Sequence, residues 1–293
     1  MFLNLVNPNV IRRDKLKKII NNYNKDKVNK PDNIINITLD GSYCKEYNNS
    51  KTECIFINYC RDNYKNKIID KKNIEHFYFI TFNTMNPQLT NMNEITENKI
   101  EILNKMFHIE DFNYKINDDG HIYIIMNNLQ GNFLSDIKIG NICNKLLTLI
   151  KTINEHTERK IYIRPHLKDI EYNRLEIYKN IKKSFKNVYI DTSQKINMDN
   201  VYCVFIQNTK FMFHFASLGI PIYNLNLVNY NYFPEIYINN ISIINKLKDN
   251  VNILPSIKDF MYKYYKFMYT EEDLEHPEFL NKLVKDYKKI ILK

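Results

Sequence analysis

The chain has 293 residues, of which 44% are hydrophobic and 13% aromatic, enough apolar side chains for one large or two compact cores and against global disorder. Its formal net charge of +9 permits a polyanionic partner such as nucleic acid without demanding one, because part of it reflects a general bias toward Lys. Five cysteines without a CxxC pair argue against a disulfide framework or a structural zinc site.

The sequence gives no sign of a membrane protein. No stretch reaches the roughly 18 apolar residues of a membrane-spanning helix, and the apolar run at the N-terminus is too short for a signal peptide. We therefore expect no membrane span and a cytoplasmic location.

Short apolar runs alternate with amphipathic segments along the chain, a pattern typical of βαβ units and a parallel sheet. The first part is predicted to hold strands at 2–6, 34–39, 53–59 and 76–82 and helices at 11–23 and 96–108. A polar turn at 117–120 follows and is the best candidate for a domain boundary.

The alternation is cleaner after this turn. Strands are predicted at 121–126, 160–164, near 188–191, 202–206 and 220–225, with helices at 136–155, 170–185, 210–218, 255–268 and 277–291. We therefore expect an α/β protein with two Rossmann-like domains, namely an N-terminal lobe at 1–117, a ligand-binding lobe at 118–254 and C-terminal helices at 255–293 that cross back.

Two basic or polar segments follow predicted strands of the second lobe, where ligands of parallel sheets bind. Arg164, His166 and Lys168 come directly after the strand at 160–164, and their cationic groups suit a diphosphate, although a solvated basic loop would look the same. Asn208, Thr209 and Lys210 follow the strand at 202–206 and open a helix. They would either place backbone N–H groups on a phosphate or simply cap that helix.

Two further segments are candidates for the site. Gln130 and Gly131 lie in a turn after the strand at 121–126, where backbone N–H groups can approach a phosphate, as they can in many βα loops. Asp40 ends a strand of the first lobe and is the best-placed carboxylate there to take a proton from an acceptor hydroxyl. An Asx turn without catalytic role is the alternative for Asp40.

Motifs of several other enzyme classes are absent from the sequence. There is no Asp-x-Asp pair for a metal-bridged diphosphate, and no P-loop, dinucleotide, zinc-protease or serine-hydrolase signature. Neutralisation of a phosphate is therefore expected to come from basic side chains and helix ends, without a metal ion.

The order of these motifs resembles the donor lobe of GT-B glycosyltransferases of the capsular-polysaccharide type, and more specifically their viral and bacteriophage branch that glycosylates modified DNA bases. The resemblance covers about residues 97–280. It rests on the stretches HIYIIMNNLQGNF, HTERKIYIRPHLKD, ASLGIP and FMYKYYKFMYTEEDL. Leu167 stands where the family usually has proline, and Asp40 where it usually has glutamate.

The resemblance implies a glycosyltransferase that moves a sugar from a nucleotide-sugar donor, expected to be a UDP-sugar, to an acceptor hydroxyl. Arg164 and His166 would contact the donor phosphates and stabilise the leaving group, and Asp40 would act as base. The remaining donor-binding residues would be Gln130, Gly131, Lys168, Asn208, Thr209 and Lys210.

Several alternatives for the partner and the activity stay open. The favoured acceptor is a hydroxymethylated pyrimidine in viral DNA, which makes double-stranded DNA a candidate partner, and the net charge and the many aromatic side chains are compatible with this. A polysaccharide or glycolipid is the second acceptor class. A non-catalytic GT-B-like domain that binds DNA or serves as a scaffold is the third possibility.

Overall fold

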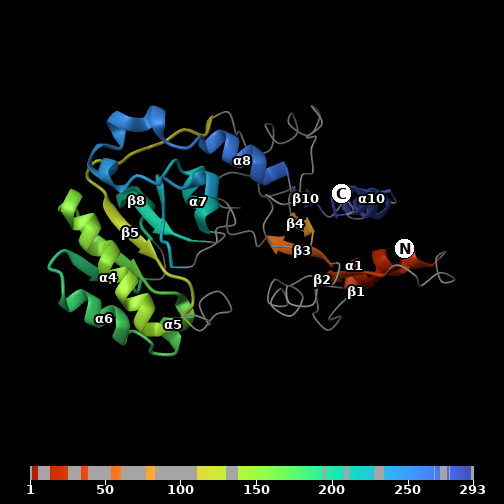
Figure 1. Cartoon of the computed structure of the whole chain (residues 1–293), viewed down its shortest axis with the longest axis horizontal. Helices are drawn as coiled ribbons and strands as arrows, with labels where there is room; N and C mark the ends of the chain where they lie inside the picture. Colours follow the sequence, from red (N-terminus) through yellow and green to blue (C-terminus); the bar gives the residue numbers. More distant parts are fainter. Residues whose placement is uncertain are drawn as a thin grey trace. The chain divides into compact units, whose positions relative to one another are not determined.

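The computed structural model of the chain contains two compact units (Figure 1). Residues 1–108 and 262–293 form the first unit, and residues 109–261 form the second. The structure describes residues 2–5, 14–25, 34–38, 54–60, 77–82, 111–129, 138–193, 196–207, 211–227, 234–266, 268–270, 276 and 278–291.

The first unit contains a five-stranded sheet in the order β1-β2-β3-β4-β10. Its strands are β1 (Phe2–Leu5), β2 (Ile34–Thr38), β3 (Cys54–Cys60), β4 (Phe77–Phe82) and β10 (Met268–Thr270). The four predicted N-terminal strands are confirmed. The expectation of a fully parallel sheet is wrong here, because β4 runs antiparallel to β3 and β10 runs antiparallel to β4. Antiparallel neighbours need no crossover connection.

Two helices belong to this unit, α1 (Asp14–Asn24) and α10 (Phe279–Ile291). Each has an apolar face that becomes buried, with Ile20 on α1 and Leu280 and Leu283 on α10. Both helices were predicted from their spacing of apolar residues. The predicted helix at 96–108 lies outside the described residues.

The second unit contains a fully parallel five-stranded sheet in the order β7-β6-β5-β8-β9. Its strands are β5 (His121–Ile125), β6 (Ile161–Arg164), β7 (Val188–Ile190), β8 (Val201–Ile206) and β9 (Ile222–Asn224). Along the chain, β6 and β7 are added on one side of β5, and β8 and β9 are then added on the other side. The strand order therefore reverses between β5 and β8, which is where ligands bind in open α/β sheets.

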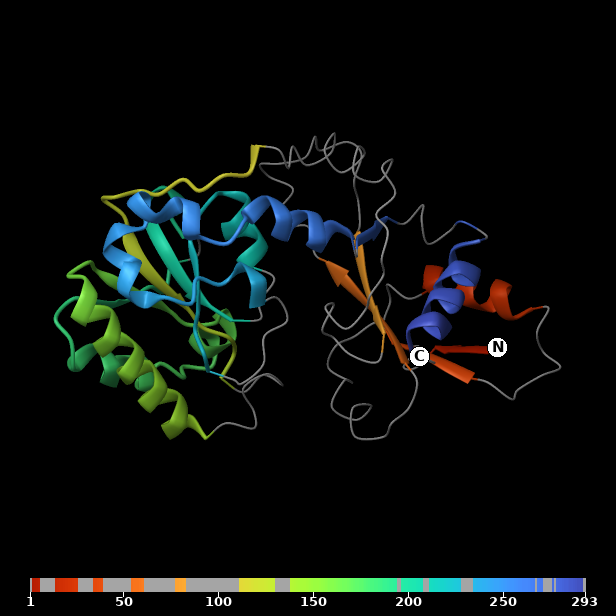
Figure 2. The ribbon, with the colours of Figure 1, turned by 45° about the horizontal axis from the view of Figure 1, so that its top comes forward.

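Helices cover both faces of this sheet. Helix α4 (Ile139–His156) buries Ile142, Leu146 and Ile150 at helical spacing against the strands, and α6 (Glu176–Lys183) packs beside it. Figures 1 and 2 show α4 and α6 next to each other on one face, with α7 (Phe211–Ser217) on the other. Right-handed crossovers that leave β5 in opposite directions require this arrangement.

The remaining elements are five short helices and the longer helix α8, in which the two units meet along the chain. They are α5 (Leu167–Glu171), α8 (Ile257–Lys266) and the 3-10 helices η5 (Met198–Asn200), η6 (Pro234–Ile236), η7 (Ile241–Lys246) and η8 (Lys248–Ile253). The boundary between the two units falls inside α8, after Met261.

The predicted helix at 170–185 is wrong in one respect, because the structure has two helices there. Helix α5 begins earlier, at Leu167, and ends at Glu171, and α6 begins at Glu176. Asn173 between them has φ of 53°, in the left-handed region that ends helices and that asparagine tolerates better than most residues.

Candidate functional site

The candidate site lies at the carboxyl ends of β5, β6 and β8, next to the reversal of strand order. The predicted residues of the RPH segment belong to this edge, since Arg164 ends β6 and His166 precedes α5. The segment at 208–210 follows β8, which is two strands away from β6, or about 10 Å at the usual spacing of strands.

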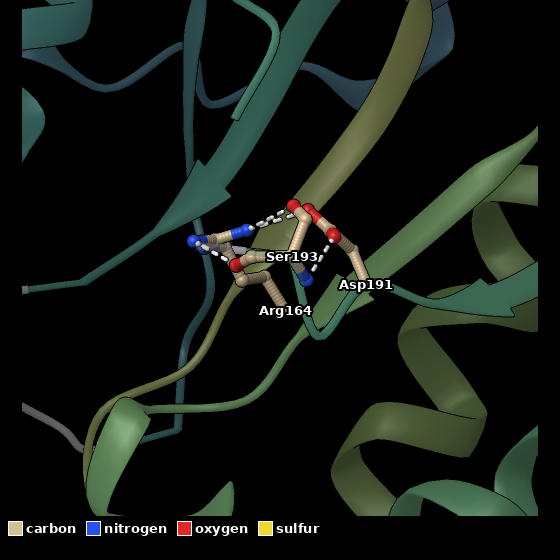
Figure 3. Close-up of polar contacts among 3 residues, drawn as sticks. All are labelled: Arg164, Asp191 and Ser193. Carbon is tan, nitrogen blue, oxygen red and sulfur yellow. Dashed lines mark hydrogen bonds and ion pairs between the residues drawn. The ribbon is translucent and has the colours of Figure 1, made fainter. Parts of the chain in front are cut away.

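Arg164 is held by the chain that follows β7 (Figure 3). Its Nη1 donates to the Asp191 carboxylate at 2.6 Å and to the Ser193 hydroxyl at 3.1 Å, and its Nη2 donates to the Ser193 carbonyl at 2.8 Å. The side chains of Arg164 and Asp191 are each only 12% exposed. The guanidinium is thus fixed in orientation and its charge is partly balanced by a carboxylate.

The electrostatics of Asp191 follow from these contacts. Burial alone would raise the pKa of Asp191, but hydrogen bonds from Ser193 and the guanidinium of Arg164 outweigh burial and hold the pKa below its usual value. Asp191 therefore stays ionised at neutral pH. Arg164 retains its Nε–H and one Nη2–H that donate to no other described residue, and these are the donors that remain for a ligand.

His166 caps the short helix α5. Its Nδ1 accepts a hydrogen bond from the backbone N–H of Lys168 at 3.2 Å, and its backbone is extended, with φ −64° and ψ 145°. An acceptor at Nδ1 places the proton of the neutral imidazole on Nε2, so the half-exposed ring presents an N–H donor on its far side. Lys168 itself is exposed at the start of the same helix.

Leu167 occupies the first position of α5 and is 56% exposed. Its backbone N–H makes no hydrogen bond to a described residue, and the extended His166 before it has the conformation that precedes proline. Proline is favoured at this first helical position. The backbone at Leu167 is therefore compatible with proline at this position.

Two buried polar residues of this edge are absent from the predicted donor-binding set, although Gln207 opens the polar segment that follows the predicted strand at 202–206. Asp169 and Gln207 are both fully buried, with 0% exposure, although carboxylates and amides rarely are. Asp169 accepts the backbone N–H of Leu129, and Gln207 accepts the backbone N–H of Leu227 through Oε1 at 2.8 Å. The signal that could have found them is a polar side chain directly after, or one short turn after, an apolar strand.

A polar contact joins every pair of neighbouring strands at this edge of the sheet. From one side to the other, the contacts are Arg164 with Asp191 for β6 and β7, Asp169 with Leu129 for β6 and β5, Asn127 with the Gln207 carbonyl for β5 and β8, and Gln207 with Leu227 for β8 and β9. Such a network holds the strand ends in fixed positions relative to one another. The edge is therefore preorganised for a ligand.

Lying outside the described residues are Asp40, Gln130, Gly131, Asn208, Thr209 and Lys210. Leu129 and Gln207, the described residues that precede two of these segments, both belong to the polar network.

In the part of the chain that the structure describes, no three His, Cys, Asp or Glu side chains gather as they would around a metal ion. Within the same residues, no helix has the length and apolar character needed to cross a bilayer.

Comparisons with known proteins identify only distant similarities. No protein-family model and no curated protein matches the sequence. The chain is similar to the crystal structure of a glycosyltransferase from Rickettsia africae ESF-5, with 12% identity, 87% of this chain and 70% of that chain covered, and a TM-score of 0.32. It is also similar to the pneumococcal O-GlcNAc transferase GtfA in complex with UDP and GlcNAc, with 13% identity, 92% and 59% covered, and a TM-score of 0.29.

Proposed function

We propose that this chain is a nucleotide-sugar glycosyltransferase whose donor phosphates bind at the carboxyl edge of the second sheet. One observation carries the proposal: an oriented arginine and a histidine with an outward N–H donor follow a single strand, beside the reversal of strand order. Arginine forks and imidazole N–H groups are suited to phosphate oxygens. The preorganisation of Arg164 by Asp191 and Ser193 fits a group that must act without rearranging.

In this proposal the chain supplies the charge stabilisation for sugar transfer. The acceptor oxygen forms a bond to the anomeric carbon while the bond from that carbon to the donor phosphate breaks, and the electron pair leaves with the phosphate. Arg164, His166 and Lys168 stabilise the negative charge that develops there. Asp40 takes the proton of the acceptor hydroxyl. The segment at 208–210 contributes further contacts to the phosphates, with Gln130 and Gly131 beside them.

The domain and cofactor assignments belong to the same proposal. The protein would be a GT-B enzyme with an acceptor lobe at 1–117, a donor lobe at 118–254 and C-terminal helices at 255–293, and its donor would be a UDP-sugar. Cationic side chains would neutralise the diphosphate in place of a metal ion. The favoured acceptor is a hydroxymethylated pyrimidine in double-stranded DNA, supported by the net charge of +9.

A nucleotide-binding experiment tests the proposed donor site. Purified protein is heated with UDP, CDP, GDP or CMP, and with uridine as the control that lacks phosphate. A ligand at 100 times its Kd stabilises the native state by about 2.7 kcal/mol, which raises Tm by about 5 °C in a protein of this size. We expect UDP to give such a shift and uridine to give none. Equal shifts with UDP and uridine, or no shift with any nucleotide, would refute a phosphate-binding edge.

Two further measurements distinguish an enzyme from a scaffold domain and a DNA acceptor from a glycan acceptor. Slow hydrolysis of the bound nucleotide-sugar without acceptor is expected of an enzyme and not of a scaffold domain. Binding to double-stranded DNA that weakens steeply between 50 and about 200 mM salt would favour the DNA acceptor, because phosphate contacts release counterions, whereas a neutral glycan gives no such slope.

A further inference from the structure

Asp169 is a buried carboxylate placed directly behind the candidate phosphate site. It lies on α5, three residues after His166, and its side chain is completely inaccessible to solvent. Both carboxylate oxygens accept the backbone N–H of Leu129, at 3.3 and 3.2 Å, and Arg174 forms an ion pair with it at 3.8 Å. One side chain thus joins the chain that leaves β5 to the helix that follows β6.

The position of His166 depends on the same residue. The backbone N–H of Asp169 donates to the His166 carbonyl at 2.8 Å, so the two residues form the first turn of α5. The Asp169 carboxylate fastens that turn to the chain that leaves β5. Asp169 consequently sets where the imidazole of His166 lies relative to the carboxyl end of β5.

The carboxylate is held at a cost in stability. Burial raises the pKa of Asp169, against the opposing effects of the Leu129 N–H, His166, Arg174 and the Tyr178 hydroxyl on α6. A carboxyl group whose folded pKa is raised binds its proton more tightly in the native state. Ionisation of Asp169 therefore lowers the free energy of unfolding. This loss is absent below the ordinary pKa of the carboxyl group, grows as pH rises and is complete above the raised pKa. A neutral amide of the same shape would avoid this penalty.

A destabilising group kept beside a site is typical of function, because active sites accept lower stability in exchange for a required geometry. An amide in this place could accept the Leu129 N–H through its oxygen alone, and it would carry no charge for the partly exposed Arg174. The acceptor-only carboxylate is the group that satisfies both donors at once.

We propose that Asp169 is a positioning residue of the phosphate site, which holds His166 and the Leu129 backbone in the arrangement that binds the donor. This inference rests on the proposed function. It assigns no contact between Asp169 and the ligand, since the side chain is buried. Its effect on the donor is transmitted through the first turn of α5.

The test compares Asp169→Asn with the wild-type protein. Calorimetry with UDP gives the affinity, thermal unfolding without ligand gives the stability, and the initial rates of hydrolysis of the UDP-sugar give KM and kcat. We expect Tm of Asp169→Asn at pH 7.5 to equal or exceed that of the wild type, and the Kd for UDP to rise about 10-fold or more. KM should rise with it, because the phosphate site is misplaced before chemistry begins.

Ile150→Val is the matched control, since it removes one methylene from the fully buried face of α4 and touches no polar contact of the edge. It should lower Tm and leave the Kd for UDP unchanged. If Asp169→Asn keeps or raises Tm and at the same time binds UDP more weakly, a merely structural role is excluded.

A failure of the positioning role of Asp169 and a failure of the proposed function give different results. If wild-type protein binds UDP and Asp169→Asn binds it equally well, the positioning role is overturned and the donor site stands. If wild-type protein binds none of UDP, CDP, GDP and CMP, the proposed function fails and the role of Asp169 fails with it. A fall in Tm of Asp169→Asn to that of the control, with a parallel loss of affinity, would assign the residue to folding.

Discussion

Replacement of Arg164 by alanine is expected to lower sugar transfer by about 10²-fold or more, the usual scale for removal of a preorganised group that stabilises developing charge. The expected loss is large because the guanidinium is already oriented by Asp191 and Ser193 and needs no rearrangement during the reaction. Steady-state transfer or donor hydrolysis measures the effect, and it should appear mainly in kcat.

The ion pair with Asp191 calls for a control, because alanine at 164 also leaves a largely buried carboxylate without its partner. Asp191→Asn removes the same ion pair and keeps the guanidinium. We expect this variant to retain activity within about 10-fold of wild type, since one charged hydrogen bond is weakened while the phosphate donors remain. Equal losses of transfer activity in Arg164→Ala and Asp191→Asn would mean that the ion pair serves the fold alone. Transfer at the wild-type rate by Arg164→Ala would show that Arg164 is not part of the site.

Alanine at Gly219 is expected to destabilise the protein by about 3 kcal/mol or more. Gly219 follows α7 with φ of 75°, a left-handed conformation that side chains disfavour. An added Cβ would collide with the Asn113 carbonyl and lie 2.8 Å from the Lys115 backbone nitrogen, whose N–H donates to the Gly219 carbonyl. The contact is between two backbones, so no side-chain rotation can relieve it. Urea denaturation followed by circular dichroism measures the loss.

Gly140 is the matched control for this prediction. It lies in the exposed first turn of α4, and nothing comes within 4 Å of an added Cβ. Alanine there should stabilise the protein by about 0.5–1 kcal/mol, because it restricts the unfolded chain and favours the helix. Similar unfolding midpoints for the two alanine variants would contradict the assigned backbone conformation at Gly219.

The strands of both sheets other than β10 could be predicted from the sequence, because their apolar runs are short and their boundaries are polar. The stretch HIYIIM, for example, gives a buried strand at His121–Ile125, and the RPH segment lies at the end of β6 as expected from the proline that follows Arg164. The parallel order of the second sheet follows from the alternation with helices.

Other features depend on local conformations that apolar spacing does not encode. The apolar pattern at 170–185 continues across the break between α5 and α6, which is made by the left-handed backbone of Asn173. Strand β10 follows α8 closely in a stretch rich in Tyr and Phe, where helix and strand preferences are similar, and pairing with β4 decides in favour of the strand.

The contacts of the candidate site were predicted only in part. Arg164 and His166 could be found because cationic residues after a strand are a local signal. The pairing of Arg164 with Asp191 joins residues 27 positions apart and needs the three-dimensional register of β6 with β7. Asp169 was missed and Gln207 was assigned no contact, because a polar side chain after a strand can be recognised in the sequence, whereas its burial cannot.

Hydrogen–deuterium exchange with and without UDP tests the central claim most directly, namely that the carboxyl edge of the second sheet binds the phosphates of a nucleotide. The prediction is slower exchange in peptides that cover 127–129 and 164–170, with uridine giving no such change. Unchanged exchange in these peptides, while UDP slows exchange only in the first unit, would contradict the account.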